Sequence, residues 1–475
     1  MPWHNIRHGM PPHSSIDGRV NGRAPSLLIV AVLVGVGALL RLINANAELW
    51  YDEIVTVIHF VHVPFTQVVS TYGLANNHVL NSVLVNLVGA WLGTDPWLLR
   101  LPALCFGIAG VWAFWWVAVA IWPRAAALAG TGLFAVSYHH VYYSQNARGY
   151  SALIFFGLVA TGCVLRLASD APPSRRWPLE LAYAGAIGLG LYAMLLMTFV
   201  VAGHGLVLLA QRRWRLLAVV MGGAALGGGL YAPMATSLVA YYRAHPTDTG
   251  YPLLSLAFAQ AVAPLAPLLL AGVAVMLPIV LRLWRRQPLA AAMLLAPLAF
   301  NVAVPLLRGQ GVYPRSFIFG LPVAYLLLVE AFDWGRARRP VIAAAAATVL
   351  AAASIVKLVP FYQLPKQGFR QALGYIDAHA RPGDRRAGFV LGGKAARFYD
   401  GRYALIEDPQ QLRAWVSRER APGWIVSTFA ADLRAREPQL DAWLHANAAD
   451  RAEFPGVIGD GTVHVYYWAG RSGAP

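Results

Sequence analysis

Long uninterrupted apolar segments recur along most of this 475-residue chain, and they constrain its fold more than any other feature. A helix needs about 20 apolar residues to cross roughly 30 Å of hydrocarbon, and only helices and closed barrels satisfy their backbone hydrogen bonds there. The segments lack the alternation of barrel strands, so they predict helices. Charged residues are 13% of the chain, against about a quarter in soluble domains. The sequence therefore predicts a mainly α, polytopic transmembrane helical bundle.

The apolar segments predict about eleven crossings, with a margin of two. Their expected ranges are 27–43, 99–122, 125–143, 150–168, 178–194, 195–211, 215–237, 253–281, 288–307, 314–332 and 340–360. The apolar stretch 79–92 would add a twelfth crossing and move the end of the chain to the other side of the membrane. The sequence alone leaves both counts open.

Basic residues are concentrated in the short connections between the apolar segments. Lys and Arg outnumber Asp and Glu, 38 to 22, and clusters lie at 212–215, 282–286 and 336–339. Such clusters are retained in the cytoplasm, so membrane topology explains the charge and no nucleic-acid partner is expected. Residues 1–26 are polar and predict a disordered cytoplasmic tail ahead of a membrane domain at 27–363.

Two further segments have their own patterns. In the first outer loop, 44–78, apolar residues at helical spacing on both sides of Pro64 predict two short interfacial helices. The segment 364–475 is richer in charge and predicts a small extracytoplasmic α/β domain. Its expected strands are 387–391, 424–428 and 462–468, and its expected helices are 367–380, 410–420 and 439–446.

An acidic pair, Asp52 and Glu53, directly follows Trp50 and Tyr51 where the first membrane helix emerges into water. A charged side chain costs about 2.5 to 3.5 kcal/mol at a bilayer centre. Two acids flanked by aromatic residues at a helix exit therefore indicate an interfacial site. The simpler alternative is that the pair stabilises the N-terminus of an interfacial helix, where negative charge is favourable.

Four short motifs in order resemble one known group, the polytopic GT-C glycosyltransferases, and specifically bacterial relatives of protein O-mannosyltransferases and the lipid A aminoarabinose transferase. They are Trp50-Tyr51-Asp52-Glu53, Leu99-Arg100-Leu101-Pro102-Ala103-Leu104, Tyr143-Ser144-Gln145-Asn146-Ala147-Arg148-Gly149-Tyr150 and Tyr313-Pro314-Arg315-Ser316-Phe317-Ile318-Phe319. Two positions depart from the family pattern. Asn77-His78-Val79 replaces the usual His-Pro-Pro, and Asn146 replaces the usual Glu of the third motif.

The resemblance implies an inverting glycosyltransferase of the bacterial inner membrane, with a cytoplasmic N-terminus and a periplasmic C-terminal domain. It implies a polyprenyl-phosphate-linked sugar as donor and a hydroxyl of a cell-envelope lipid, polysaccharide or protein as acceptor, and membrane lipids are further partners. The residue types agree with this chemistry, since a lipid phosphate is already a good leaving group. Arg or Lys can neutralise its charge, and one carboxylate can accept the acceptor's proton.

Roles for individual residues follow from the resemblance and from their side chains. Asp52 is the expected general base and Glu53 a group that orients it, and both are candidate ligands of a divalent metal, Mg or Mn. No cofactor is otherwise expected. The candidates for binding the donor phosphate and sugar are Arg148, Arg315, Arg308, His78, Tyr150, Tyr51 and Trp50. Each has a plainer alternative as an interfacial or packing residue.

Two other functions remain open. A transporter or flippase of lipid-linked sugars predicts charged residues near the bilayer midplane and two related halves, whereas the acids cluster outside the spans and no repeat is evident. A non-catalytic scaffold with a GT-C-like fold is the third reading, and the missing carboxylate at Asn146 favours it.

Overall fold

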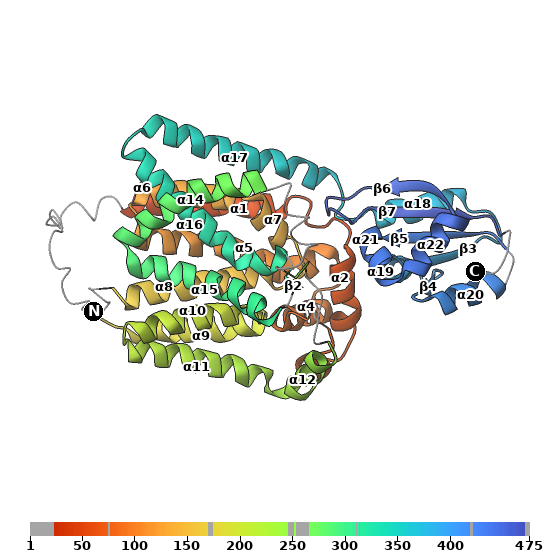
Figure 1. Cartoon of the computed structure of the whole chain (residues 1–475), viewed down its shortest axis with the longest axis horizontal. Helices are drawn as coiled ribbons and strands as arrows, with labels where there is room; N and C mark the ends of the chain where they lie inside the picture. The colour runs from red at the N-terminus through yellow and green to blue at the C-terminus, as the bar shows by residue number, and fades with distance from the viewer. Residues whose placement is uncertain are drawn as a thin grey trace.

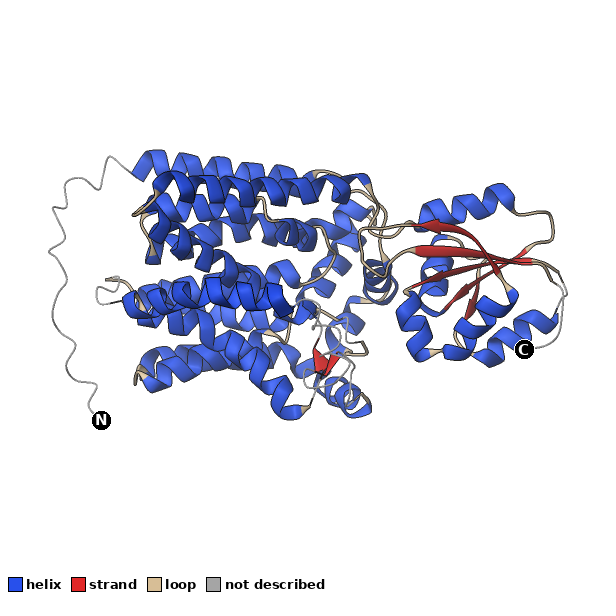
Figure 2. Ribbon diagram, turned by 45° about the horizontal axis from the view of Figure 1, so that its top comes forward, coloured by secondary structure: helices blue, strands red, loops and turns tan. Residues whose placement is uncertain are grey.

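The structure is a computed structural model that describes residues 23–74, 77–169, 174–245, 251–252, 266–309, 311–312, 314–418 and 421–470. A helical bundle and a smaller α/β domain lie one after the other along the long axis (Figures 1 and 2). The bundle consists of α1 (Arg23–Leu42), α2 (Tyr51–Thr56), η2 (Val57–Val61), α3 (Phe65–Ser70), α4 (Val79–Trp91), α5 (Pro96–Ile121), α6 (Arg124–Ala135), α7 (Tyr138–Ser144), α8 (Tyr150–Leu167), α9 (Trp177–Ala193), α10 (Met197–Ala210), α11 (Trp214–Tyr231), η3 (Ala232–Met234), α12 (Ala235–Ala244), β1 (Tyr251–Pro252), α14 (Ala266–Arg286), α15 (Pro288–Arg308), β2 (Gly311–Val312), η5 (Pro314–Gly320), α16 (Leu321–Arg336) and α17 (Pro340–Gln363).

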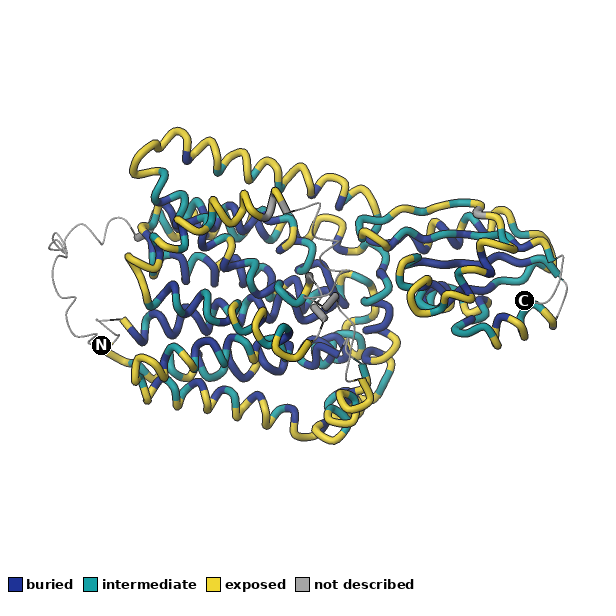
Figure 3. The backbone as a smooth tube through the Cα atoms, in the orientation of Figure 1, coloured by how far each residue is buried: buried dark blue, intermediate teal, exposed yellow. Residues whose placement is uncertain are grey.

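Six helices in the described part of the chain are long and apolar enough to cross a membrane: α5, α8, α11 with η3 and α12, α15, α16 with the end of η5, and α17. The prediction of a polytopic helical bundle is confirmed. Figure 3 shows α17 as a largely exposed helix along one side, and only 11% of its most apolar 18-residue stretch is buried within the protein. An exposed apolar face of this length is suited to contact with lipid. Residues 1–22 of the tail predicted at 1–26 and the start of the predicted span 253–281 lie outside the described residues, and α1 begins at Arg23, within the predicted tail.

One predicted span is wrong in detail, because the range 125–143 forms two helices, α6 and α7, with a break at Val136 and Ser137. Two contacts accompany the break: Ser137 caps α7, and the buried guanidinium of Arg41 on α1 donates to the carbonyl of Ala135 and to Ser144 Oγ, both at 3.1 Å. The Arg41 side chain thus satisfies a carbonyl at the end of α6, where the chain turns inside the bundle.

The apolar stretch 79–92 forms α4, which has 13 residues. At 1.5 Å per residue it is roughly 20 Å long, short of the 30 Å that a crossing needs. It packs against the first loop, where the Asn86 side chain donates to the carbonyls of Phe60 and Val63 at 2.8 and 3.0 Å. These contacts and its length argue against a full crossing at 79–92. The predicted span 195–211 forms a helix of similar length, the 14-residue α10, so the number of crossings stays a prediction. We call this end of the bundle, which carries α2, η2, α3 and α4, the loop end, and the opposite end, with the clusters 212–215, 282–286 and 336–339, the basic end.

The C-terminal domain lies next to the loop end (Figure 1). Its five-stranded sheet has the order β4-β3-β5-β7-β6. β3 is parallel to its neighbours β4 and β5, and β7 is antiparallel to its neighbours β5 and β6. The strands are β3 (Arg385–Phe389), β4 (Ala404–Ile406), β5 (Gly423–Thr428), β6 (Ala449–Phe454) and β7 (Val463–Trp468), and the helices are α18 (Phe369–His379), α19 (Val390–Tyr399), α20 (Pro409–Arg418), α21 (Ala430–Arg436) and α22 (Pro438–Asn447). The predicted α/β character is confirmed, while α19, α21 and the strands β4 and β6 were not expected.

Gly392 and Gly393 belong to α19 and allow this helix to pack closely on the sheet. A Cβ at Gly393 would lie 2.2 Å from the carbonyl oxygen of Gly388, and one at Gly392 would lie 2.9 Å from Cα of Ser427. These contacts explain the two glycines by helix–strand packing.

Candidate functional site

Helix α2 begins at the acidic pair. Trp50 is its N-cap, and the backbone N–H of Trp50 donates to Glu53 Oε2 at 3.4 Å. Successive helical residues point about 100° apart, so the two neighbouring acids face different surroundings. Glu53 turns into the protein and is 0% exposed, whereas the Asp52 side chain is 15% exposed.

Besides the Trp50 N–H, three groups donate to the Glu53 carboxylate. Arg100 of α5 binds both oxygens, with Nε to Oε1 at 2.8 Å and Nη2 to Oε2 at 2.6 Å. The backbone N–H of Ala147 donates to Oε1 at 2.9 Å, and the ammonium of Lys366 donates to Oε2 at 3.3 Å. A bidentate guanidinium fixes the orientation of a carboxylate as well as its charge. Glu53 thus joins α2, α5, the segment before α8 and the linker after α17.

The charges of this cluster shift the pKa values of both Glu53 and Lys366. Burial alone would raise the pKa of Glu53, but Arg100 and Lys366 beside it lower that pKa to about 2. Burial and the nearby Arg100 lower the pKa of Lys366 to about 7, against the opposite effect of Glu53. Glu53 is therefore ionised at neutral pH, and it lies between two basic side chains, Arg100 and Lys366.

Asp52 faces two arginines from distant parts of the chain. Arg148, almost fully buried, hydrogen-bonds to Oδ2 of Asp52. Nη1 of Arg315, on η5, lies 3.7 Å from the same oxygen, and the Arg315 side chain is 47% exposed. The structure therefore brings together three of the predicted site residues. One cation is fixed inside the protein, and the other sits at its surface.

The segment from Gln145 to Gly149 places Arg148. The amide of Gln145 donates to the carbonyls of Arg41 and Ile43 at 2.9 and 2.7 Å. The side chain of Asn81 donates to the carbonyl of Ala147 at 2.8 Å. Hydrogen bonds from α1 and α4 therefore hold the segment on both sides, so Arg148 is presented by a fixed backbone.

His78 packs against this segment. Its Nδ1 accepts the backbone N–H of Gly149 at 2.9 Å, so in the neutral ring the proton is on Nε2. Burial, with Arg148 and Arg315 nearby, holds the pKa of His78 well below its usual range. The Tyr150 ring lies 5.0 Å from that of His78, and the Arg148 guanidinium lies 5.1 Å from the centre of the Tyr150 ring. His78 and Tyr150 thus form an aromatic layer against Arg148.

The other predicted site residues have different surroundings. The indole of Trp50 donates to Oδ1 of Asn146 at 2.6 Å, so the position that departs from the family pattern is engaged in a side-chain contact. The ring of Tyr51 lies 6.0 Å from that of Phe429 and thus faces the C-terminal domain. Arg308 is exposed in the last turn of α15.

Sequence reasoning assigned no role to Arg100, Lys366 or Gln367. The motif with Arg100 was noted, and an arginine inside an apolar run is a signal for a buried partner. The linker residues carry no comparable signal, because nothing in their neighbourhood indicates that they fold back over a loop more than 300 positions earlier.

The acidic pair does not have the surroundings of a divalent metal site. Both oxygens of Glu53 accept hydrogen bonds, and Asp52 faces two guanidinium groups. Divalent cations such as Mg²⁺ take several oxygen ligands, and no group of three or more His, Cys, Asp or Glu side chains gathers in the described part of the chain. Cationic side chains occupy the space beside the acids, so the residues present do not fit Mg or Mn.

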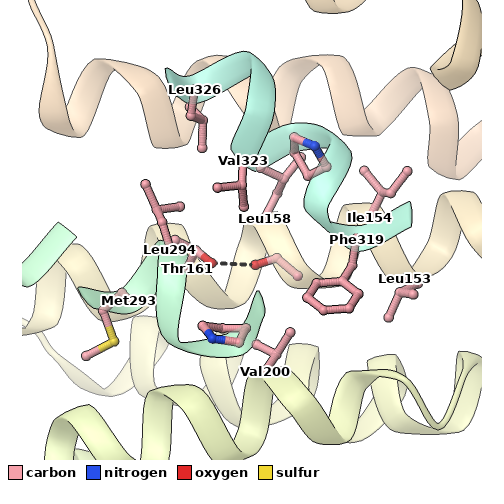
Figure 4. A pocket seen from close by; sticks show the side chains of 13 residues that line it. Leu153, Ile154, Leu158, Thr161, Val200, Met293, Leu294, Phe319, Val323 and Leu326 are labelled. Carbon is pink, nitrogen blue, oxygen red and sulfur yellow. Dashed lines mark hydrogen bonds between the residues drawn. The ribbon is translucent and has the colours of Figure 1, made fainter. Parts of the chain in front are cut away.

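A separate cavity lies among the membrane helices and is not part of this site (Figure 4). Thr161 is the one hydroxyl-bearing residue of its lining, and this hydroxyl donates to the carbonyl of Gly157 at 2.8 Å. The other lining residues are Leu153, Ile154, Gly157, Leu158, Val200, Met293, Leu294, Pro297, Phe319, Pro322, Val323 and Leu326. Such an apolar lining offers nothing to hold a sugar or a phosphate.

No protein family and no curated protein matches the sequence. The fold does match solved structures. ArnT from Cupriavidus metallidurans bound to undecaprenyl phosphate is 14% identical over 94% of this chain and 98% of its own, with a TM-score of 0.52. The apo state of ArnT gives the same identity and coverage with a TM-score of 0.51. This likeness concerns the fold: the chain shares the fold of ArnT over nearly its whole length.

Proposed function

We propose that this protein is an inverting glycosyltransferase that moves a sugar from a polyprenyl phosphate to a hydroxyl of a cell-envelope lipid, polysaccharide or protein. The observation that carries the proposal is Asp52 facing Arg148 and Arg315 at the loop end of a membrane bundle. A carboxylate and two guanidinium groups are what a transfer from a lipid phosphate requires. The fold is that of ArnT, which binds undecaprenyl phosphate.

The chemistry follows from these three side chains. The donor phosphate enters between Arg148 and Arg315, whose guanidinium groups then pair with phosphate oxygens in place of Asp52. Asp52, released from its partners, accepts the proton of the acceptor hydroxyl as the oxygen attacks the anomeric carbon. The bond between that carbon and the phosphate oxygen breaks, and the configuration inverts. The negative charge that develops on the leaving phosphate is neutralised by the two arginines.

The cellular setting belongs to the same proposal. Positive clusters at the basic end favour the cytoplasmic side for that end, so the loop end and the C-terminal domain would face the periplasm of a bacterial inner membrane. There the acid pair would meet the lipid-linked donor at the membrane surface. The acceptor would approach from the envelope.

A transporter is less well supported by the charged residues of the membrane helices. In the described parts of these helices the acids are Glu180 in the first turn of α9 and Glu330 and Asp333 toward the end of α16. Arg282 pairs with both Glu330 and Asp333 at the basic end. These acids lie near helix ends and not at the bilayer midplane that a substrate pathway requires.

The experiment that tests the proposal compares cells with and without this chain by mass spectrometry of envelope lipids, glycans and proteins. A mass increment that depends on the chain identifies both sugar and acceptor. Asp52→Asn should reduce the modified fraction by about 10² to 10⁴-fold, the usual contribution of a general base. Asp95→Asn is the matched control, because Asp95 is exposed and makes no side-chain cap hydrogen bond. Full modification by a well-expressed Asp52→Asn variant would disprove the proposed mechanism.

A further inference from the structure

The linker between α17 and the C-terminal domain runs through the site and does not pass over its surface. Lys366 and Gln367, between the end of α17 and the start of α18, are both buried. The backbone N–H of Val457 donates to the carbonyl of Pro365 at 3.1 Å, so the chain before β7 holds the linker in place. A Cβ at Gly456 would lie 2.2 Å from the carbonyl oxygen of Lys366, which shows how closely the two segments approach.

Lys366 contacts two parts of the site at once. Its ammonium donates to Oε2 of Glu53 at 3.3 Å and to the carbonyl of Gln145. The charged or titratable groups around it are Glu53 from α2, Arg100 from α5 and the ring of Tyr142 from α7, whose centre is 5.9 Å away. The carbonyl of Gln145 lies three residues before Arg148, in the segment that presents the arginine to Asp52.

Gln367 extends the same connection to the C-terminal domain. Its Oε1 accepts the backbone N–H of Tyr51 at 2.8 Å, next to Asp52. Its Nε2 donates to Thr428 Oγ1 at 3.1 Å and to the carbonyl of Gly461 at 3.3 Å. The first turn of α2 is therefore tied to the end of β5 through one side chain.

We propose that Lys366 is a positioning residue for the transfer. Because it hydrogen-bonds to both Glu53 and the Gln145 carbonyl, it sets the distance between Arg148 and Asp52. This inference rests on the proposed function. Arg100 alone already makes a bidentate pair with Glu53, so a second cation is not needed to fix that carboxylate. Lys366 adds a second link to the segment that carries Arg148: the Ala147 N–H already binds Glu53, and the ammonium also holds the Gln145 carbonyl at the start of that segment. A displacement of about 1 Å at a reacting group is enough to cost 10²-fold in rate.

The test uses the full-length protein and the mass increment found for the wild type, expressed per folded molecule by gel filtration of the purified protein. Lys366→Met removes both hydrogen bonds, and Lys366→Gln retains donors without the charge. Both should lower the rate of modification by about 10²-fold, and Lys366→Arg should recover at least part of the loss. Lys357→Met is the matched control, since Lys357 is exposed on α17.

A double-mutant cycle separates positioning from simple stabilisation. If Lys366 acts through the Glu53 cluster, the rate losses of Lys366→Met and Glu53→Gln will not add in the double variant. A wild-type rate per folded molecule in Lys366→Met or Lys366→Gln, with Asp52→Asn inactive, would overturn this inference and leave the proposed function intact. Failure of both Lys366 variants to fold would make Lys366 a folding residue and would overturn it as well. Activity of Asp52→Asn would instead disprove the proposed function itself.

Discussion

Asp52 and Glu53 are neighbours on one helix, but their side chains point in different directions and have different surroundings. Asp52 retains access to the surface between two arginines, whereas Glu53 is buried among donors. A buried carboxylate that loses its partners is costly, because breaking a buried ion pair destabilises by roughly 3 to 5 kcal/mol. The opening motif therefore combines an expected reactive group with the residue that holds the surrounding segments together.

The pKa of Glu53 makes folding stability depend on pH in a defined direction. In the folded state this pKa is about 2, below the usual value of 4.5, so the unfolded chain binds the proton more tightly. The contribution of Glu53 is complete above about pH 4.5 and is lost as the pH falls toward 2. Thermal unfolding in detergent should therefore show a decline over this range that is weaker in Glu53→Gln. Equal pH profiles for the two proteins would contradict this assignment.

The residues of the site were only partly accessible to sequence reasoning. Asp52, Arg148 and Arg315 stand in short motifs next to apolar segments, where charge is costly and therefore noticeable. Lys366 stands in a linker of ordinary composition, and its importance depends on how the chain folds back. A local pattern reveals a charged residue beside an apolar segment. It does not reveal a residue of ordinary composition whose role depends on contacts with distant parts of the chain.

Among the elements, the junction between α7 and α8 is the part on which the site depends most. Gly149 is the N-cap of α8, and a Cβ there would lie 2.8 Å from the carbonyl of Ala193 and 2.9 Å from Cβ of His78. Neither atom can move easily, since one is a backbone oxygen and the other is the Cβ atom of a buried histidine. The glycine is what allows α9, His78 and this junction to meet.

Gly149→Ala should therefore displace the segment with Arg148 and reduce modification of the envelope more than it reduces the amount of folded protein. The control is Gly185→Ala on α9, where nothing lies within 4 Å of an added Cβ and alanine favours the helix by about 1 kcal/mol. The measurement is the modified fraction per folded molecule for each variant. A wild-type value for Gly149→Ala would show that the junction tolerates the shift.

The elements that composition determines were predicted well, and those that distant contacts determine were not. The apolar segments became helices because their length and hydropathy suit a membrane whatever surrounds them. The break between α6 and α7 is accompanied by Arg41, 94 positions from the carbonyl that it binds. The one local signal is Ser137, the N-cap of α7, whose hydroxyl accepts the backbone N–H of His140 at 3.4 Å. A single serine inside an apolar run is a weak signal, and the prediction missed it.

At the scale of the whole molecule, the two ends of the bundle differ in charge and should lie on opposite sides of the membrane. Cysteine labelling in sealed right-side-out vesicles tests this, in a background without Cys105 and Cys163. Ser417→Cys, exposed on α20, should react with an impermeant maleimide at once, and Gln211→Cys, exposed at the basic end, only after detergent is added. The reverse pattern would place the acid pair in the cytoplasm.

The long return of the linker has a consequence for biosynthesis. Glu53 and Lys366 are 313 positions apart, and at 5 to 20 residues per second a ribosome needs roughly 15 to 60 s to make the chain between them. During that interval the nascent protein can already insert its first helices and expose Asp52 to the lipid pool. We expect transfer to stay about 10²-fold below the full rate until the last helix has crossed and Lys366 reaches Glu53, so that an incomplete polypeptide consumes little activated sugar.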